Sequence, residues 1–473
     1  MSRVLMVASE VFPLAKTGGL ADVVGALPAA LQAVDDEVAV VAPRYGGIDL
    51  EGARRVWDNA PIYFDTDRYD TSIYLAPAEF PLYLIDCPPL FDRQGLYGEA
   101  GEDYPDNHIR FAVLARAALT VARFLFRTEI FHCHDWQAGL VPAYTKTAFA
   151  NDPTFLGIKT LFTIHNLGYQ GLFPKSALAE VGMDESTYTP EGLEFFGQVS
   201  YLKAGIAYAD ALNTVSPTYA REIQTPEYGF GMDGALRARA GVLTGILNGV
   251  DYRDWSPETD PSIPARYSVS DLRGKRVCKQ HLLEEFGLPG TAMEAPLIGI
   301  VSRFTRQKGT DLIAQIAGEI VAEGMYLVAI GNGEPEYEEF FTRMAAQYPD
   351  RIAVRVGFDN GVSHRIEAGA DLFLMPSQYE PCGLNQMYSL KYGTVPVVRA
   401  TGGLNDTIED ATGFKFQEYS GQALMAALRA AGRAFCNRSG WEAMMRRGME
   451  QDFSWGRSAA AYSALYRKLL GSH

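Results

Sequence analysis

Residues 4–31 read VLMVASEVFPLAKTGGLADVVGALPAAL, and they combine a strand pattern, a glycine pair and a helix pattern in succession. The apolar run VLMVAS (4–9) has the length and composition of a buried strand. A helix is predicted over 20–31, with one apolar face formed by Leu20, Val23, Val24, Leu27 and Leu31. Pro28 is expected to kink or divide that helix, because proline lacks the N–H that the helix ladder needs.

The same strand–glycine–helix order returns near the other end of the chain. The stretch TVPVVRATGGLNDTI (394–408) repeats the letters TGGL after an apolar run. Other apolar runs predict buried strands at 38–43, 82–86, 160–166, 211–216, 297–302, 326–331, 353–357 and 372–377. Strands that alternate with helical patterns form parallel sheets covered on both faces, so the predicted class is α/β.

Two sheets fit this pattern better than one. The segment NGVDYRDWSPETDPSIPA (248–265) is rich in turn-formers and reads as a connection. A fresh strand–loop–helix series begins near Pro296, and TGGL falls once in each half. We therefore expect two Rossmann-like domains, 1–248 and 249–455.

Composition narrows the classes of function. The chain has 473 residues, 47% hydrophobic and 21% charged, with a formal net charge of −15. So acidic a chain is a poor generic nucleic-acid binder, although a local basic pocket could still hold an anion. No apolar stretch approaches the roughly 20 residues that span a bilayer, and a signal peptide is not evident.

The cysteines are scattered along the chain without CxxC spacing, at Cys87, Cys133, Cys278, Cys382 and Cys436. This arrangement argues against a disulfide framework and a structural zinc site, and it suits a reducing compartment. We expect a cytoplasmic protein.

The glycine pairs allow a ligand to approach the backbone closely. Gly18 and Gly19 lie where a helix begins, so free N–H groups and the helix dipole favour an anion there, and Lys16 adds a positive charge. The alternative is a plain turn between strand and helix. The later TGGL offers a second backbone cradle through Thr401, Gly402 and Gly403.

Three cations precede a predicted helix in LIGIVSRFTRQKGTDLIAQIAGEI (297–320). Arg303, Arg306 and Lys308 follow a strand at the edge where open α/β sheets bind ligands, and such a cluster suits a diphosphate. The alternative is a solvated run of charges.

Other motifs carry weaker signals. GNGEPE (331–336) lacks the third glycine of a dinucleotide fingerprint, so NAD is not favoured. The acidic pair in DTD (65–67) could hold a metal, but its surroundings favour a polar turn. HCHDWQ (132–137) contains HxH without further ligands nearby, so zinc is disfavoured.

HCHDWQ also places Asp135 and Trp136 at the end of a predicted strand, and His165 ends another strand in TIHNLG. Trp136 and Tyr97 are candidate rings for stacking on a sugar, although an aromatic residue can equally belong to the core.

The segment QYEPCGLNQMYSLKYGTVPVV (378–398) is the most specific one. Glu380 follows a predicted buried strand, where a carboxylate can hold sugar hydroxyls. Cys382 could be a nucleophile, but no histidine adjoins it in sequence, and we disfavour that role.

Together these motifs resemble glycosyltransferase family 5, which contains bacterial glycogen synthases and plant starch synthases. The matching stretches, in the family's order, are KTGGLADVVGALP, HDW, TIHN, NGVD, SRFTRQKG and YEPCGLNQMYSLKYGTVPVVRATGGLNDT. The resemblance covers essentially the whole chain. It implies the GT-B fold, with two Rossmann-like domains facing each other across a deep cleft, the first binding the acceptor and the second the nucleotide sugar. It also implies that a C-terminal helix, 456–473, packs back onto the first domain.

The implied reaction is retaining transfer of glucose from ADP-glucose to the non-reducing end of an α-1,4-glucan such as glycogen. No metal, cofactor, nucleic acid or membrane takes part in it. By resemblance the leaving phosphate accepts the proton of the acceptor hydroxyl, while Asp135 and His165 shield a glucose of oxocarbenium character. The segment 248–265 is expected to act as a hinge.

The resemblance also assigns residues. Arg303 and Lys308 would neutralise the diphosphate, and Glu380 would hold glucose hydroxyls. Phe358 would stack on the adenine. The remaining substrate-binding candidates are Lys16, Gly18, Gly19, Tyr97, Asn248, Cys382, Gly383, Leu384, Thr401, Gly402 and Gly403.

Several alternatives stay open. No residue excludes UDP-glucose as the donor. A glucan-binding scaffold with an inactive site is disfavoured, because Lys16, Arg303, Lys308 and Glu380 are all intact. A phosphorylase would need a longer chain with a lysine that binds pyridoxal phosphate. A hydrolase would need a second carboxylate in a strong motif. An epimerase would not be expected to carry KTGGLAD together with EPCGL. Related GT-B enzymes often carry a second glutamate eight positions after the first; here that position is Tyr388, which leaves the ribose contact unassigned.

Overall fold

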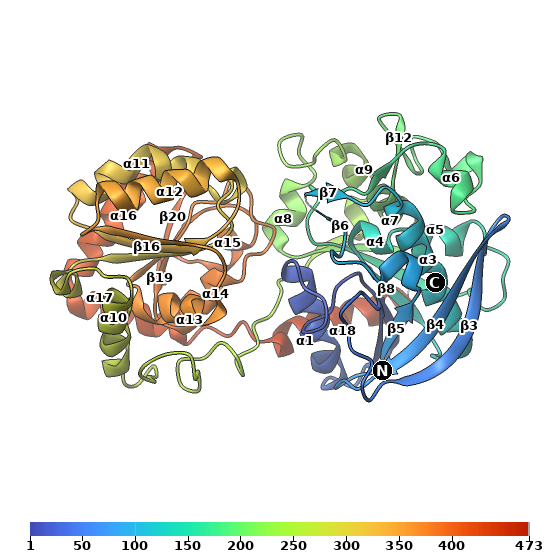
Figure 1. Ribbon diagram of the computed structural model, residues 1–473, viewed down its shortest axis with the longest axis horizontal. Helices are drawn as coiled ribbons and strands as arrows, with labels where there is room; N and C mark the ends of the chain where they lie inside the picture. Colours follow the sequence, from blue (N-terminus) through green and yellow to red (C-terminus); the bar gives the residue numbers. More distant parts are fainter. Residues whose placement is uncertain (100, 472–473) are drawn as a thin grey trace. The chain divides into compact units, whose positions relative to one another are not determined.

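The computed structural model describes residues 1–99 and 101–471, which form two compact units (Figure 1). Unit 1 comprises Met1–Gly249 together with the chain from Trp455 onward. Unit 2 is the continuous segment Val250–Ser454. Each unit has its own sheet.

The sheet of unit 1 has nine strands. Their order is β14 (Leu243–Gly245), β13 (Ala211–Thr214), β9 (Lys159–Ile164), β8 (Ile130–His134), β1 (Arg3–Val7), β2 (Glu37–Pro43), β5 (Leu82–Asp86), β4 (Asp67–Ala76) and β3 (Arg54–Phe64). The strands from β14 to β5 pair in parallel, as the apolar runs predicted. β4 and β3 pair antiparallel and extend one edge, so the expectation of a purely parallel sheet was wrong there. These two strands escaped prediction because few of their residues are buried, and DTD is the polar turn between them.

Helices and short strands surround this sheet. The helices are α1 (Gly19–Gln32), α2 (Pro88–Phe91), α3 (Asn107–Phe124), α4 (Asp135–Ala138), α5 (Leu140–Lys146), α6 (Ala177–Glu180), α7 (Tyr201–Tyr208), α8 (Pro217–Glu222), α9 (Asp233–Ala238) and α18 (Trp455–Gly471), with 3-10 turns η1 (Glu185–Thr187) and η2 (Ala240–Val242). The short strands are β6 (Gly98–Glu99), β7 (Glu102–Asp103), β10 (Leu172–Phe173), β11 (Glu194–Phe195) and β12 (Gln198–Ser200).

Pro28 does not divide α1, although division was one of the two effects expected of it. The helix continues to Gln32, and Pro28 is buried with the predicted apolar face. Pro28 lies in the last part of the helix, so its missing N–H removes one ladder bond near the end and leaves the earlier turns intact.

The last helix, α18, packs against α1 within unit 1. Three of its side chains bond to the body of the unit. Ser458 Oγ donates to the Leu247 carbonyl at 2.7 Å, and the Tyr462 hydroxyl donates to Asn213 Oδ1 at 2.8 Å. The Tyr466 hydroxyl lies 2.8 Å from His132 Nδ1. Both tyrosines are fully buried, so the helix completes the core of unit 1.

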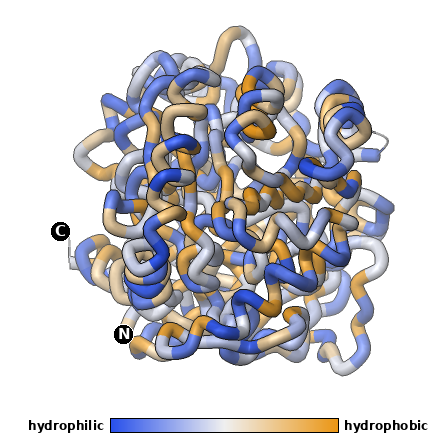
Figure 2. Tube along the Cα trace, turned by 90° about the vertical axis from the view of Figure 1, so that its left-hand side faces the viewer, coloured by the Kyte–Doolittle hydropathy of each residue, from blue (hydrophilic) through white to orange (hydrophobic). Residues whose placement is uncertain are grey.

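Unit 2 is built on a six-stranded parallel sheet. Its order is β17 (Ile352–Val356), β16 (Tyr326–Gly331), β15 (Leu297–Val301), β18 (Leu372–Met375), β19 (Val395–Arg399) and β20 (Phe414–Phe416). Its helices are α10 (Arg273–Glu285), α11 (Thr310–Ala322), α12 (Pro335–Gln347), α13 (Asn360–Gly369), α14 (Asn385–Lys391), α15 (Gly402–Thr407), α16 (Gly421–Cys436) and α17 (Arg438–Met449), with 3-10 turns η3 (Gly290–Glu294) and η4 (Arg306–Lys308). Hydrophilic and hydrophobic residues alternate along its outer helices (Figure 2), as expected of helices with one face on the sheet.

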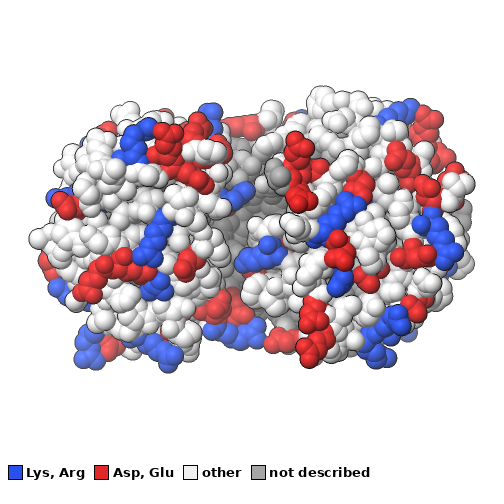
Figure 3. All heavy atoms as spheres, viewed as in Figure 1, with Lys and Arg blue, Asp and Glu red and all other residues white. Residues whose placement is uncertain are grey.

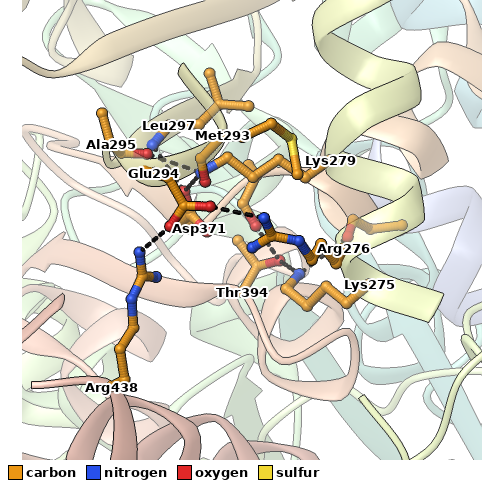
Figure 4. A network of polar contacts seen from close by, with 12 residues as sticks. Lys275, Arg276, Lys279, Met293, Glu294, Ala295, Leu297, Asp371, Thr394 and Arg438 are labelled. Carbon is orange, nitrogen blue, oxygen red and sulfur yellow. Dashed lines mark hydrogen bonds and ion pairs between the residues drawn. The ribbon is translucent and has the colours of Figure 1, made fainter. Parts of the chain in front are cut away.

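A buried ion pair fastens α10 to the sheet of unit 2 (Figure 4). Lys279 Nζ lies 2.6 Å from Asp371 Oδ2 and also donates to the Met293 and Ala295 carbonyls. The same carboxylate accepts the Leu297 N–H at the start of β15. This network fixes where β15 begins, and β15 leads directly into the predicted cation cluster.

Candidate active site

A buried carboxylate, that of Glu10, holds the KTGGL loop between β1 and α1. Its oxygens accept the Thr17 N–H at 2.7 Å, the Thr17 hydroxyl at 2.5 Å and the Gly18 N–H at 3.3 Å. The Tyr97 hydroxyl donates to the same carboxylate at 2.6 Å and lies 2.8 Å from Ser9 Oγ. Glu10 is only 3% exposed, so the start of the loop is fixed from inside the unit.

The two glycines of this loop face open space. A Cβ atom placed on Gly18 or Gly19 would meet no atom within 4 Å, and Gly18, which lies at the start of α1, has no side chain of its own to cap the helix. Lys16 is exposed and pairs with Asp22 at 2.6 Å. The geometry therefore leaves room for a ligand against this backbone, and the binding of a ligand there stays a prediction.

Asp135 sits on a strained turn directly after β8. Its φ of 55° is unusual for a non-glycine residue, and its Oδ1 accepts the His165 N–H at 2.7 Å. Burial raises the pKa of Asp135 to about 7, although the N–H groups of His165 and Asn166 act in the opposite direction. The structure thus brings together the ends of β8 and β9, and with them two predicted catalytic residues.

His165 is bonded by a second histidine. His134 Nδ1 lies 3.0 Å from His165 Nε2, and burial lowers the pKa of His165 to about 3, so both rings are neutral near pH 7. His134 Nε2 is buried without a partner among the described residues. Because an unpartnered acceptor is tolerated better than an unpartnered N–H, we assign the His134 proton to Nδ1, donating to His165. The proton of His165 then lies on its Nδ1.

The two predicted stacking rings belong to an aromatic cluster. Trp136 packs edge-on against Phe111, with centroids 4.9 Å apart, and lies 6.4 Å from the Tyr97 ring. A Cβ on Gly171 would lie 2.5 Å from the Trp136 ring, and Trp136 is 9% exposed. Trp136 is thus a core residue. Tyr97 supports the loop through Glu10, and its contact with a sugar stays a prediction.

Asn248 lies just before the end of the first segment of unit 1. It is 6% exposed, and its Oδ1 is buried without a partner among the described residues. An unsatisfied buried carbonyl oxygen is a natural acceptor for a ligand hydroxyl.

In unit 2, the predicted cation and the predicted carboxylate meet. Lys308 Nζ lies 2.6 Å from Glu380 Oε2, although the two residues are far apart in sequence. Ser377 Oγ donates to the same oxygen at 3.0 Å. Glu380 is 5% exposed, whereas the Lys308 side chain is partly open to solvent. Both lie at the carboxyl ends of neighbouring strands, β15 and β18.

Arg303 and Arg306 are more exposed than Lys308. Arg303 Nη2 makes a long 3.3 Å contact with Gln307 Oε1, so its guanidinium remains available to a ligand. Phe358 follows β17 and is 78% exposed. Since the strands of this sheet run in parallel, all three follow strands that end at the same edge.

The second glycine pair packs against the protein itself. The Gly403 N–H donates to the Glu380 and Pro381 carbonyls, and a Cβ on Gly403 would lie 2.0 Å from the Cys382 carbonyl oxygen. Gly402 has a φ of 43°, and a Cβ there would lie 1.8 Å from the Glu380 carbonyl. These glycines let α15 approach the Glu380 turn. The two TGGL motifs therefore differ: the glycines of the first face open space, whereas those of the second pack against the backbone of the turn at Glu380 and Cys382.

The remaining candidates line the same turn. Cys382 is 4% exposed, and Gly383 has a φ of 70°. Leu384 lies at the start of α14, which the Asn385 amide ties to the Val301 carbonyl at the end of β15. Thr401 is fully buried at the start of α15.

Sequence reasoning missed three supporting residues: Glu10, His134 and Ser377. A charged residue immediately after a buried strand was a usable signal for Glu10. His134 had no such signal, because its partner His165 lies far along the chain. Ser377 had none either, because it acts only through one hydroxyl group that donates to Glu380.

The described residues carry charged groups and possible metal ligands in both units. Within them, no group of three or more His, Cys, Asp or Glu side chains is arranged to hold a metal ion. On the face seen in Figure 3, acidic and basic side chains are interspersed over both units. None of the helices in the described part of the chain combines the length and apolarity needed to cross a bilayer.

Comparison with known proteins gives consistent matches. Residues 3–238 match the family model of the starch synthase catalytic domain, and 284–432 match that of glycosyl transferases group 1. A glycogen synthase of Anaeromyxobacter dehalogenans (strain 2CP-C) is 51% identical, and one of Koribacter versatilis (strain Ellin345) is 48% identical. The match to the first relative covers 99% of both chains, and the match to the second covers 98% of both chains.

Solved structures agree with these matches. The catalytic domain of starch synthase IV from Arabidopsis thaliana, bound to ADP and acarbose, superposes with a TM-score of 0.90 at 33% identity, over 99% of both chains. Sucrose-phosphate synthase from Thermosynechococcus elongatus shares only the fold, with a TM-score of 0.61 at 17% identity.

Proposed function

This chain belongs to the family of glycogen synthases and starch synthases, and from that premise we propose how its residues transfer glucose from ADP-glucose to an α-1,4-glucan. It has the GT-B fold and is a glucosyltransferase that uses a nucleotide sugar and a glucan. ADP-glucose as the donor is supported by the starch synthase structure, which was solved with ADP.

The observation that carries the proposal is the ion pair between Lys308 and Glu380, 2.6 Å apart. A buried glutamate that holds an ammonium group keeps a cation ready for an anionic substrate. When the diphosphate arrives, Lys308 can turn to it, and Glu380 can accept hydroxyls of the glucose. Arg303 is exposed and also follows β15, so it adds a second charge for the diphosphate.

We assign the adenine of the nucleotide sugar to unit 2 and the glucan acceptor to unit 1, and we assign the donor's phosphates and glucose to residues of both units. The exposed Phe358 ring supplies a surface for the adenine, at the same sheet edge as the cations. In unit 1, the open backbone at Gly18 and Gly19, with Lys16, serves the donor phosphates. Asn248, Asp135 and His165 serve the glucose.

In the proposed reaction, the glucan's terminal 4-hydroxyl attacks C1 of glucose from the face that ADP leaves. The C1–O bond to the phosphate breaks, ADP departs with the bonding electrons, and a phosphate oxygen takes the hydroxyl proton. Lys308 and Arg303 stabilise the charge that grows on the phosphate. The Asp135 carboxylate stabilises positive charge on the sugar. The anomeric configuration is retained, and no metal or cofactor is required.

One incubation tests the proposal. The purified protein receives a short maltooligosaccharide and either ADP-glucose or UDP-glucose in the presence of a chelator, and nucleotide release and chain growth are followed. We expect elongation from ADP-glucose, and its loss in Lys308→Ala and Glu380→Ala. Elongation from UDP-glucose alone would overturn the donor assignment. Nucleotide release without chain growth would indicate a hydrolase or an epimerase, and glucan binding without any reaction would indicate a scaffold.

A cytoplasmic location also remains our proposal. Its support is that all five cysteines are free thiols in the described part of the chain, as expected in a reducing compartment.

A further inference from the structure

Unit 1 carries two turns in which a phenylalanine adopts a left-handed backbone. Phe196 and Gly197 join β11 to β12 with φ values of 47° and 81°. Phe230 and Gly231 precede α9 with φ values of 46° and 83°. Two successive positive φ values are typical of a type I′ turn, whose first position strongly prefers Asn, Asp or Gly.

A bulky residue is strained in this conformation, because its Cβ comes too close to the following carbonyl oxygen. Folding alone would favour asparagine at both positions. The rings are not used to fill the core, because Phe196 is 81% exposed and Phe230 is 40% exposed. The strain thus presents aromatic surface to the outside.

The two turns lie against each other. A Cβ on Gly231 would lie 3.0 Å from the Phe196 ring and 3.1 Å from the Phe195 ring, and these two rings are 4.7 Å apart between centroids. The Gln170 amide donates to the Phe230 carbonyl at 3.0 Å. This bond places the neighbouring Tyr169, which is 54% exposed, beside the second turn. We call Tyr169, Phe196 and Phe230 the aromatic platform.

One loop links the aromatic platform to the candidate active site. Tyr169 stands four residues after His165 on the same loop, and Gly171 at the end of that loop packs on Trp136, the neighbour of Asp135. A polymer whose reacting end lies near His165 would therefore pass close to these rings.

We propose that the aromatic platform binds a segment of α-1,4-glucan some residues away from the reacting end. Pyranose rings have apolar C–H faces that stack on aromatic rings, and the glucan is uncharged, which suits a surface made of neutral rings. This inference rests on the proposed function, since it assumes a glucan acceptor. It assigns to unit 1 a second surface for the glucan, which strengthens the binding of long acceptors and makes no contact with short ones.

The first test measures binding without any turnover. Electrophoresis of the full chain through gels with and without glycogen gives the dissociation constant from the retardation. The variants are Phe196→Asn, Phe230→Asn and the double variant, with Tyr63→Asn as the control, because Tyr63 on β3 is 49% exposed and its exposure lies between those of Phe230 and Phe196. We expect the double variant to bind glycogen at least about fivefold more weakly, the equivalent of roughly 1 kcal/mol. The control should bind like the unaltered chain, and Phe196→Tyr should retain binding.

Folding is checked in the same samples. Asparagine is the preferred residue in these turns, so the melting temperature of the Asn variants should stay equal or rise while binding falls. A structural role alone would give the reverse. If the unaltered chain is not retarded by glycogen, or if the double variant is retarded equally, the proposal is overturned. It is also overturned if the substitutions change only the oligomeric state, which would indicate contact with a second copy.

The second test separates this inference from the proposed function. With ADP-glucose as donor, the double variant should show a KM for glycogen raised at least about fivefold, with KM for maltotriose and for ADP-glucose within about twofold of the unaltered values. Equal rises for both acceptors would overturn the inference. Loss of transfer in the unaltered chain would contradict the proposed function instead, while the binding measurement still judges the aromatic platform.

Discussion

Asp135 gives the reaction a pH dependence that can be measured. Its pKa is raised to about 7 by burial, so its charged fraction increases as the pH rises through 7. If the carboxylate stabilises positive charge on the sugar, kcat/KM should rise from about pH 6 to about pH 8. Asp135→Asn should lose at least about 100-fold in kcat and show no such rise. A flat pH–rate profile for the unaltered chain near pH 7 would contradict this role.

The same pKa predicts an opposite trend in stability. The folded state binds the Asp135 proton more tightly than the unfolded state, whose carboxyl has a pKa of about 4. The stabilisation is therefore full below about pH 4 and is lost as the pH rises through about 7. Comparing melting temperatures of the unaltered chain and Asp135→Asn between about pH 5 and pH 8 isolates this contribution.

His134 should act by fixing the tautomer of His165. An asparagine at position 134 places an N–H near the position of the imidazole Nδ1, so His134→Asn should keep the bond to His165 Nε2. His134→Leu removes it, and the loss of one hydrogen bond should lower kcat by roughly two- to tenfold. Nitrogen NMR of the His165 ring provides the decisive readout. The Nδ1–H tautomer should persist in the asparagine variant and become mixed in the leucine variant, whereas an unchanged tautomer in both would refute the assignment.

At the scale of an element, the two TGGL turns should respond differently to the same substitution. Gly403→Ala forces a Cβ against the Cys382 carbonyl, which is backbone and cannot move aside, so it should cost about 3 kcal/mol or more of stability. Gly18 is extended, with open space around it, so Gly18→Ala should leave stability within about 0.5 kcal/mol.

Ligand affinity should reverse that order. If phosphate groups approach the backbone at Gly18, the added methyl should raise KM for ADP-glucose even though the fold is intact. Thermal unfolding and donor kinetics of the two variants together check this prediction. Equal loss of stability in Gly18→Ala and Gly403→Ala would mean that the backbone at Gly18 is also packed closely against the rest of the protein.

The elements themselves were largely predictable from the sequence. Every predicted strand was confirmed, and all are largely buried except the edge strand β17, where only Ile352 is buried. A buried parallel strand is apolar along its whole length and stands out between turn-formers. The antiparallel pair β3 and β4 was missed, since its exposed residues break the apolar signal. Lys308 and Glu380 were each predicted as site residues, but their direct pairing depends on the order of β15 and β18 in the sheet. That order is a long-range property, as are the bonds of Glu10 and His134.

At the scale of the whole molecule, unit 1 depends on a helix from the far end of the chain. A polypeptide that ends at Ser454 lacks the buried Trp455, Tyr462 and Tyr466 and leaves His132 and Asn213 without their tyrosine partners. We expect it to lose roughly 5 kcal/mol or more, enough to unfold unit 1. Unit 2 is continuous and should stay folded.

Hydrogen exchange can follow the two units separately. Amides of β8 and β13 should lose protection in the shortened polypeptide, whereas amides of β15 and β16 should keep it. A synthetic peptide of residues 455–473 should restore part of the protection in unit 1. Full protection of β8 without that peptide would show that α18 is dispensable.

The return of α18 to unit 1 also has a consequence for synthesis on the ribosome. The segment Met1–Gly249 emerges first, yet it cannot be completed until Trp455 and the residues after it have been translated. At about 5–20 residues per second, the intervening unit 2 takes roughly 10–40 seconds to make, and it can fold during that time. The part of the chain made second is therefore expected to mature first. A nascent chain that stalls late leaves an exposed apolar surface where α18 should lie, which makes such incomplete products ready targets for chaperones and proteases.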